Sequence, residues 1–165
     1  KGFLVDQSEL CISASAQRKL KTVPANTVLV LVRGMMLLRR IPISLTCRDS
    51  TFNQDVKAIL PNRELDPEYL AHVLLSRQSQ LLAAVETAGH GTGRLDTGLL
   101  GDVEIPVPSI DVQQRVARCL SAIEATTSAY LRRLAQIRSE RAELIRLLTD
   151  PPCNRHVERV RERSE

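Results

Sequence analysis

The residues best suited to chemistry form a glycine-rich segment, Gly89-His90-Gly91-Thr92-Gly93-Arg94. Its backbone amides and the Arg94 guanidinium could bind a phosphate group, because successive amides form an anion-binding concavity and arginine pairs with phosphate oxygens. The segment is too short for a P-loop and lacks the Gly-Lys-Ser/Thr ending that such a loop requires. A flexible connector between two elements is the alternative interpretation of the same residues.

An enzyme would require a nucleophile, a general base or a set of metal ligands placed together, and the sequence contains no such combination. His72 falls in a predicted helix, where a packing or surface role is expected, and His156 falls in the charged tail. Asp150-Pro151-Pro152-Cys153 is similar to the Asp-Pro-Pro-Tyr element of amino-methyltransferases, but the aromatic residue is missing and no glycine-rich strand-to-helix turn precedes it. We therefore expect no catalytic residue, no cofactor and no metal site.

The balance of charge permits binding to a polyanion. The net charge is +4, the isoelectric point is about 9.1, and most of the positive residues are arginine. A solvated basic surface explains the same values equally well. Aromatic residues make up only 2% of the chain, which leaves few rings for stacking on unpaired bases. Double-stranded nucleic acid or a protein surface is therefore the expected partner.

Neither the cysteines nor the apolar segments indicate export or membrane insertion. Cys11, Cys47, Cys119 and Cys153 are far apart, without a Cys-x-x-Cys pair, and are interpreted as buried or incidental residues in a reducing compartment. No apolar stretch approaches the roughly 20 residues that cross a bilayer, and no signal-peptide pattern is present. We expect a cytoplasmic protein without membrane contact. The chain begins with Lys1 and enters strand-like sequence at once, so we also expect a fragment of a longer protein.

The predicted secondary structure changes at residue 109, from strands and short helices before it to one long helix after it. Before it, short apolar or alternating runs predict strands, and residues 14–20 predict a short helix. The predicted strands cover residues 2–5, 10–13, 27–32, 35–38, 41–45, 52–60 and 103–107. Asp66 as N-cap, Pro67 at the first helical position and Glu68 in the first turn predict the start of a helix, and apolar residues at helical spacing extend it to about residue 88. A mixed α/β domain of several strands around one amphipathic helix is the expected fold.

From residue 109 onward the sequence predicts one long helix. Its apolar positions alternate at steps of four and three, the spacing of a coiled-coil seam. The seam residues are Val116, Leu120, Ile123, Thr127, Tyr130, Leu134, Ile137, Arg141, Leu144 and Leu148. A helix of about 38 residues would be on the order of 57 Å long, too long to fold back along a domain of this size, so its apolar edge must meet another helix. Thr127 and Arg141 are expected to fix register, with tolerance near an exposed end as the alternative for Arg141.

The expected fold class is therefore α+β, with a mixed α/β domain followed by one long coiled-coil helix. We expect the domain at 1–108, a spacer or dimerisation helix at 109–149 and a charged tail at 150–165.

The order of these features resembles one known family. After a strand pair, the segment Phe52-Asn53-Gln54-Asp55-Val56-Lys57-Ala58-Ile59, the helix from Asp66 and the glycine-rich loop, the segment Val103-Glu104-Ile105-Pro106-Val107-Pro108 leads into the long helix. This succession, over roughly residues 28–148, resembles the specificity subunits of type I restriction-modification systems.

The family's junction before the long helix is partly kept. It reads Ile-Pro-x-Pro-Pro, then two residues and Glu-Gln, and this chain has Ile105, Pro106, Pro108 and Gln113 but Ser109 and Val112 at the second proline and the glutamate. Ser109 or Asp111 would then cap the helix.

The resemblance implies a target-recognition domain, here incomplete at its N-terminus, that reads double-stranded DNA. It also implies a helix that spaces two such domains while DNA methyltransferase subunits bind alongside. A full subunit carries two domains and two helices, whereas this chain has one of each. An antiparallel homodimer through the long helix would supply the second copy and match a two-part target. A second half of a longer parent chain would serve equally.

Within that interpretation, basic residues of the first half are expected to contact DNA, because phosphates require Arg or Lys at the surface and Arg pairs with guanine in the major groove. The predicted DNA-binding residues are Arg33, Arg39, Arg40, Arg48, His90, Thr92 and Arg94. A solvated charge or an internal ion pair is the alternative for each arginine. Asn53 and Gln54 are expected to satisfy backbone groups instead.

Two other functions remain open. One is a non-catalytic oligomerisation or adaptor module in which the coiled coil carries the function and the α/β part binds protein. The other is the target-recognition domain of a fused DNA methyltransferase. Salt-insensitive behaviour without DNA retention would favour the first, whereas binding of S-adenosylmethionine would favour an enzyme.

Overall fold

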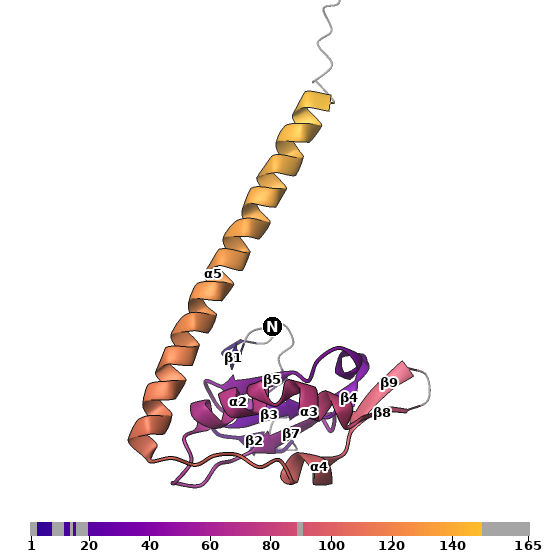
Figure 1. Ribbon diagram of the computed structural model, residues 1–165. Helices are drawn as coiled ribbons and strands as arrows, with labels where there is room; N and C mark the ends of the chain where they lie inside the picture. The colour runs from indigo at the N-terminus through magenta and orange to yellow at the C-terminus, as the bar shows by residue number, and fades with distance from the viewer. Residues whose placement is uncertain (1–2, 8–11, 14, 16–19, 89–90, 150–165) are drawn as a thin grey trace, which may run out of the picture. The chain divides into compact units, whose positions relative to one another are not determined.

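The computed structural model describes residues 3–7, 12–13, 15, 20–88 and 91–149 (Figure 1). The chain divides into two units, Lys1–Leu120 and Ser121–Glu165, and each is described by itself. The strands described all belong to the first unit. The described residues of the second unit lie in one helix, α5 (Ile110–Thr149), which begins in the first unit. Strands and helices occur together as expected for an α+β protein.

The core of the first unit contains a four-stranded sheet in the order β1 (Leu4–Val5), β5 (Ile43–Thr46), β3 (Val28–Leu31) and β7 (Val56–Ile59). β1 lies parallel to β5, and the other two pairs are antiparallel. The β-branched run of β3 suits a central strand, and Val28 and Val30 are fully buried. The strands expected at 2–5, 27–32, 41–45 and 52–60 are therefore confirmed. Each is shorter than expected, and β5 extends one residue beyond its expected end.

Two smaller sheets contain the remaining strands. β2 (Thr22–Val23) pairs with β6 (Ser50–Thr51), while β4 (Arg33–Gly34), β9 (Thr92–Leu95) and β8 (Val85–Ala88) form an antiparallel sheet in that order. Only Val32 separates β3 from β4, and its carbonyl accepts a hydrogen bond from the Leu95 amide at 2.9 Å. The central strand is thus linked by its backbone to the hairpin of β8 and β9.

The helix α2 (Pro67–Ser76) begins where the sequence predicts. The Asp66 carboxylate accepts a hydrogen bond from the Tyr69 amide at 2.9 Å, and Pro67 is the first helical residue. The buried face of α2 packs against β3 and β5. His72 belongs to this face and stacks on the Phe3 ring with 4.4 Å between the ring centroids, so it has the packing role that was expected.

The prediction of one continuous helix to about residue 88 is wrong. α2 ends at Ser76, a second helix, α3 (Gln78–Ala83), follows it, and the remaining residues form β8. After Arg77 leaves the helical conformation, the Gln78 side chain bonds to the backbone of Ile41, accepting from the amide at 2.9 Å and donating to the carbonyl at 2.6 Å. Val85 is in phase with the helix but pairs with Leu95 in the hairpin, where β-branched residues are favoured.

Two predicted strands are also wrong. Residues Met35–Leu38 form a 3-10 helix, η1, because Gly34 has a φ of 147° that turns the chain, and the Met36 carbonyl accepts hydrogen bonds from the next two arginine amides. Residues 103–107 are irregular. Pro106 has no N–H to offer a sheet, and its carbonyl accepts a hydrogen bond from the Tyr69 hydroxyl at 3.0 Å.

Other predictions concern segments that are described only in part. The glycine-rich segment is not simply a loop, because β9 begins at Thr92, while residues 89–90 lie outside the described residues. The strand expected at 10–13 and the helix expected at 14–20 also lie largely outside them, although Ile12 and Ser13 are in no strand. The tail at 150–165 lies outside them entirely.

The helix α5 confirms the predicted long helix. Its first turn shows the role of Gln113, the glutamine of the junction. The Ser109 carbonyl accepts hydrogen bonds from the amides of Val112 and Gln113, both at 3.0 Å. The Gln113 side chain is fully buried: its oxygen accepts from the Asp66 amide at 2.8 Å, and its nitrogen donates to the carbonyls of Glu64 and Pro108 at 2.9 and 2.7 Å. One amide group therefore fixes the first turn of α5 to the loop before α2.

Candidate nucleic-acid interface

Two of the predicted DNA-binding arginines lie side by side. Arg33 on β4 and Arg94 on β9 are direct partners in the antiparallel register, so their side chains leave the same face of the sheet. Both residues are exposed. Like charges directly opposite each other destabilise a sheet. An anion between the two guanidinium groups would remove that cost.

Close glycine packing fixes the position of this pair. Gly34 and Gly93 are the next partners in the register. A Cβ on Gly93 would lie 2.8 Å from the Cβ of Leu37 and 3.1 Å from the Cγ1 of Val85. Only glycine therefore allows η1 to pack this closely on the hairpin that carries Arg94.

A small hollow lies beside the arginine pair. Its volume is about 210 Å³, and it is lined by Val32, Arg33, Gln54, Lys57, Arg94, Leu95 and Thr97. The Asp55 carbonyl accepts hydrogen bonds from the Val32 and Arg33 amides at 2.7 and 3.3 Å, which ties the turn at Gln54 to the start of β4. Three cationic side chains thus line one hollow, and no carboxylate is among its lining residues.

Two of the lining residues were missed by sequence reasoning. Lys57 is exposed on β7, opposite Val30 of the central strand. The expectation that Asn53 and Gln54 are structural holds for Asn53, whose side chain accepts from the Asp55 amide and donates to the Asp55 carboxylate, both at 3.2 Å. The Gln54 side chain makes no hydrogen bond within the described part of the chain and lines the hollow instead. The available signal was a lysine between two apolar residues, Val56 and Ala58, in the predicted strand.

The other predicted residues lie elsewhere in the first unit. Arg39 and Arg40 are exposed directly after η1. Arg48 forms an ion pair with Asp6, so the alternative interpretation, an internal ion pair, applies to it. Thr92 is half-buried at the start of β9, and His90 lies outside the described residues. Of the predicted residues, Arg33 and Arg94 are therefore the two that share a defined site.

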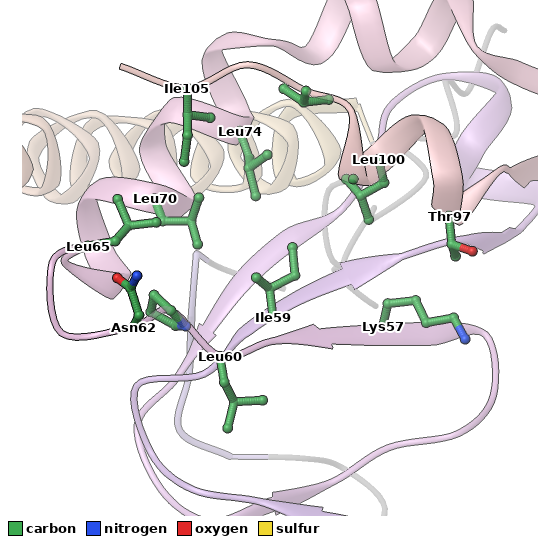
Figure 2. A pocket seen from close by; sticks show the side chains of 13 residues that line it. Lys57, Ile59, Leu60, Asn62, Leu65, Leu70, Leu74, Thr97, Leu100 and Ile105 are labelled. Carbon is green, nitrogen blue, oxygen red and sulfur yellow. The ribbon is translucent and has the colours of Figure 1, made fainter. Parts of the chain in front are cut away.

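A larger, apolar groove adjoins the hollow. It has a volume of about 590 Å³ and is lined by residues of β7, the segment 60–65, α2 and the segment 97–105. Figure 2 shows Leu65 and Leu70 towards one end of the groove and Lys57 and Thr97 at the other. Lys57 and Thr97 line both spaces, so the hollow continues from the polar end of the groove. The groove itself offers no carboxylate, imidazole or thiol among its lining residues.

The aliphatic residues of the predicted seam are exposed along α5. Exposed fractions are 38% for Val116 and 37% for Leu120 in the first unit, and 61% for Ile123 and 81% for Leu148 in the second. A row of exposed aliphatic side chains is unfavourable in water and favours a helical partner. The seam stays a prediction, and this exposed row is the feature on which it rests.

Three further features bear on the expected chemistry. Among the residues described, no group of three or more His, Cys, Asp or Glu side chains could hold a metal ion. Cys47 and Cys119 are exposed free thiols, so they are not the buried residues that one interpretation allowed. In the same part of the chain, no helix has the length and apolar character needed to cross a bilayer.

Comparison with known proteins connects this geometry to a family. The family described as Type I restriction modification DNA specificity domain matches residues 5–139. The chain is 34% identical over 128 residues to the Type I restriction enzyme EcoR124I/EcoR124II specificity subunit of Escherichia coli. That match covers 76% of this chain and 32% of the relative.

Two solved structures share the fold. One, described as "Structural basis underlying complex assembly and conformational transition of the type I R-M system", has a TM-score of 0.60 at 20% identity and covers 75% of this chain and 29% of its own. The other, the Type-I restriction-modification system S subunit from M. genitalium, has a TM-score of 0.53 at 21% identity and covers 81% of this chain and 35% of its own.

The chain spans about a third of the length of these relatives. The family match nevertheless covers most of the chain, and the curated relative is 34% identical over three quarters of it. The chain therefore belongs to the family of type I restriction-modification DNA specificity domains.

Proposed function

We propose that the chain recognises a specific sequence in double-stranded DNA, as part of the specificity subunit of a type I restriction-modification system. The observation that carries this proposal is the pair Arg33 and Arg94, held in register at the rim of a cationic hollow, on a chain of this family. Arginine contacts guanine bases and phosphates, which are the two kinds of group that a DNA-reading surface must meet.

The chain would act without catalysing a reaction itself. The hollow offers cations and an amide but no nucleophile with an adjacent base, which suits binding rather than bond cleavage. In this role it would position DNA methyltransferase and restriction subunits on the target. We propose the cytoplasm as its location, because DNA is met there in bacteria and the exposed thiols Cys47 and Cys119 suit a reducing compartment.

Pairing of α5 with a second helix would bring a second recognition domain into the complex. The exposed aliphatic row supports a partner helix, and a chain that spans about a third of its relatives supports a second half outside it. An antiparallel homodimer would place one domain at each end of a two-helix rod and match an interrupted target. A second half within a longer parent chain is the other arrangement with the same geometry.

Selection from a pool of random duplexes tests the proposal. The full chain, alone and with its methyltransferase subunit, should enrich a two-part sequence, and the affinity for that sequence should fall steeply as salt rises. Arg33→Ala and Arg94→Ala should bind the enriched sequence more weakly while keeping the unfolding transition of the unchanged chain. Arg63→Ala, which removes an exposed arginine outside the hollow, is the matched control and should bind normally.

An adaptor function is the second candidate, and the exposed seam of α5 is the observation that favours it. It predicts salt-insensitive assembly and no enrichment of any duplex, even with the methyltransferase subunit present. Calorimetry with S-adenosylmethionine should show no specific heat of binding in either case, and a measurable one would point to an enzyme.

A further inference from the structure

The hollow beside the arginine pair has the charge of an anion site. Arg33, Lys57 and Arg94 come from three different strands and line the same space. None of the nearby carboxylates lines it: Asp55 accepts from the Asn53 side chain at 3.2 Å, and Asp96 accepts from the Gly98 amide at 2.6 Å. Glu86 on β8 lies opposite Arg94 in the register and is the carboxylate that competes for its guanidinium. Three cations that share one hollow without a carboxylate repel each other, so bringing them together favours an anionic ligand.

The hollow also has a fixed frame. The Asp55 carbonyl joins the turn at Gln54 to the amides of Val32 and Arg33, and the Val32 carbonyl accepts from the Leu95 amide. Lys57 is held by the register of β7 on the central strand. Because backbone hydrogen bonds set the spacing of these residues, little conformational freedom would be lost from the backbone when an anion binds.

The size and polar lining of the hollow fit one phosphate group. Its volume of about 210 Å³ lies below the roughly 300–1,000 Å³ of pockets that enclose a whole small molecule. The two guanidinium groups can pair with phosphate oxygens, and the ammonium of Lys57 adds a point charge. Gln54, which makes no hydrogen bond within the described residues, has an amide N–H to donate.

We infer that this hollow binds one backbone phosphate of the DNA, held by Arg33, Lys57 and Arg94 with a hydrogen bond from Gln54. The inference rests on the proposed function, and it separates the residues that hold the DNA backbone from those that recognise bases. A phosphate contact fixes the position of the protein on the duplex but carries no sequence information directly. Lys57 and Gln54 therefore set the affinity for any duplex, and the choice of bases depends on residues outside the hollow.

Salt dependence tests the inference with the full chain in its assembled form. Affinity is measured by fluorescence anisotropy at several salt concentrations, on the selected duplex and on a scrambled one. Lys57→Gln should weaken binding about tenfold on both duplexes, as expected when a hydrogen bond to a charged group is lost. It should also lower the slope of log affinity against log salt, by at most about 0.9, the value for one phosphate. Gln54→Ala should weaken binding of both duplexes without changing the slope.

Lys21→Gln is the matched control, because it removes the same charge from another exposed lysine of the first unit. It should leave affinity and slope unchanged. A single neutral methylphosphonate moved along the selected duplex adds a second readout. At one position it should weaken the unchanged chain strongly and Lys57→Gln by a smaller factor, because Arg33 and Arg94 still contact that phosphate in the variant.

The outcomes separate this inference from the proposed function. If the unchanged chain selects and binds a duplex but Lys57→Gln and Gln54→Ala bind it equally well, the phosphate site is overturned and the function stands. A loss confined to the selected duplex would also overturn it, because the hollow would then read bases. Absence of duplex binding by the unchanged chain, with its methyltransferase subunit present, would overturn both.

Discussion

The buried side chain of Gln113 connects three backbone groups of the first unit. Its amide bonds to the backbone of Glu64, Asp66 and Pro108, which belong to the loop before α2 and the proline segment before α5. Because the side chain has no exposed surface, water cannot replace these partners. Gln113 thereby fixes where the long helix begins, although the sequence identifies it only as part of the junction.

Gln113→Ala should lower the free energy of unfolding by about 2 to 4 kcal/mol, since three backbone groups would lose their partner inside the protein. Urea denaturation of the full chain measures the change. Gln114→Ala, at the neighbouring exposed position, is the control and should have almost no effect. Equal stability of the two variants would show that the buried amide contributes nothing to stability.

Gly93→Ala should destabilise the hairpin by about 1 to 3 kcal/mol, because the added methyl group overlaps the side chains of Leu37 and Val85. Gly101→Ala is the matched control, since a Cβ there meets no atom within 4 Å. The same denaturation measurement compares them. DNA binding should weaken in the Gly93 variant as well, because Arg94 follows this residue. A Gly93 variant as stable as the Gly101 variant would contradict the close packing.

Glu86→Gln should strengthen duplex binding about twofold to fivefold. Glu86 lies directly opposite Arg94 on β8 and competes with the phosphate for its guanidinium, although an exposed pair of this kind is weak. Anisotropy with the selected duplex measures the gain. Glu104→Gln changes the net charge equally at another exposed position. If both variants gain equally, the effect comes from net charge and not from competition at Arg94.

At the level of elements, the start of a helix could be predicted from neighbouring residues, whereas features that depend on pairing between distant strands could not. The start of α2 was predicted to the residue, because Asp66 and Pro67 act within one turn. The end of the same helix was not predicted. Val85 satisfies the helical period, but it pairs in a strand with Leu95, which lies ten positions later in the sequence. The hollow could not be predicted for the same reason: the register of three strands brings Lys57 to the arginine pair.

The predicted seam of α5 belongs to the helix alone and can be tested without DNA. Leu134→Asp should prevent self-association of the full chain, because it places a charge in the middle of the row that a partner helix would bury. Ala135→Asp is the matched control, since it adds the same charge one position away from the seam. Sedimentation analysis should find a dimer for the unchanged chain and the control, and a monomer for Leu134→Asp. Dissociation of both variants, or of neither, would reject the seam as the interface.

For the whole molecule, the proposed function separates two tasks. The first unit would hold the DNA through the hollow, and α5 would set the distance between two such units. A helix advances about 1.5 Å per residue, so the length of α5 becomes a measure of the distance between the two halves of the target. That relation holds only if the seam keeps its phase, because a pairing that slips changes which faces meet.

Deletion of residues 124–130 tests this relation directly. Seven residues are one heptad, so the seam stays in phase while the helix shortens by about 10 Å, or about three base pairs at 3.4 Å each. Selection from random duplexes should return the same two half-sequences with a shorter gap. Deletion of five residues, 124–128, removes a similar length but rotates the seam out of phase, and it should abolish pairing. A seven-residue deletion that still pairs and selects the original gap would mean that α5 holds the units together without setting their distance.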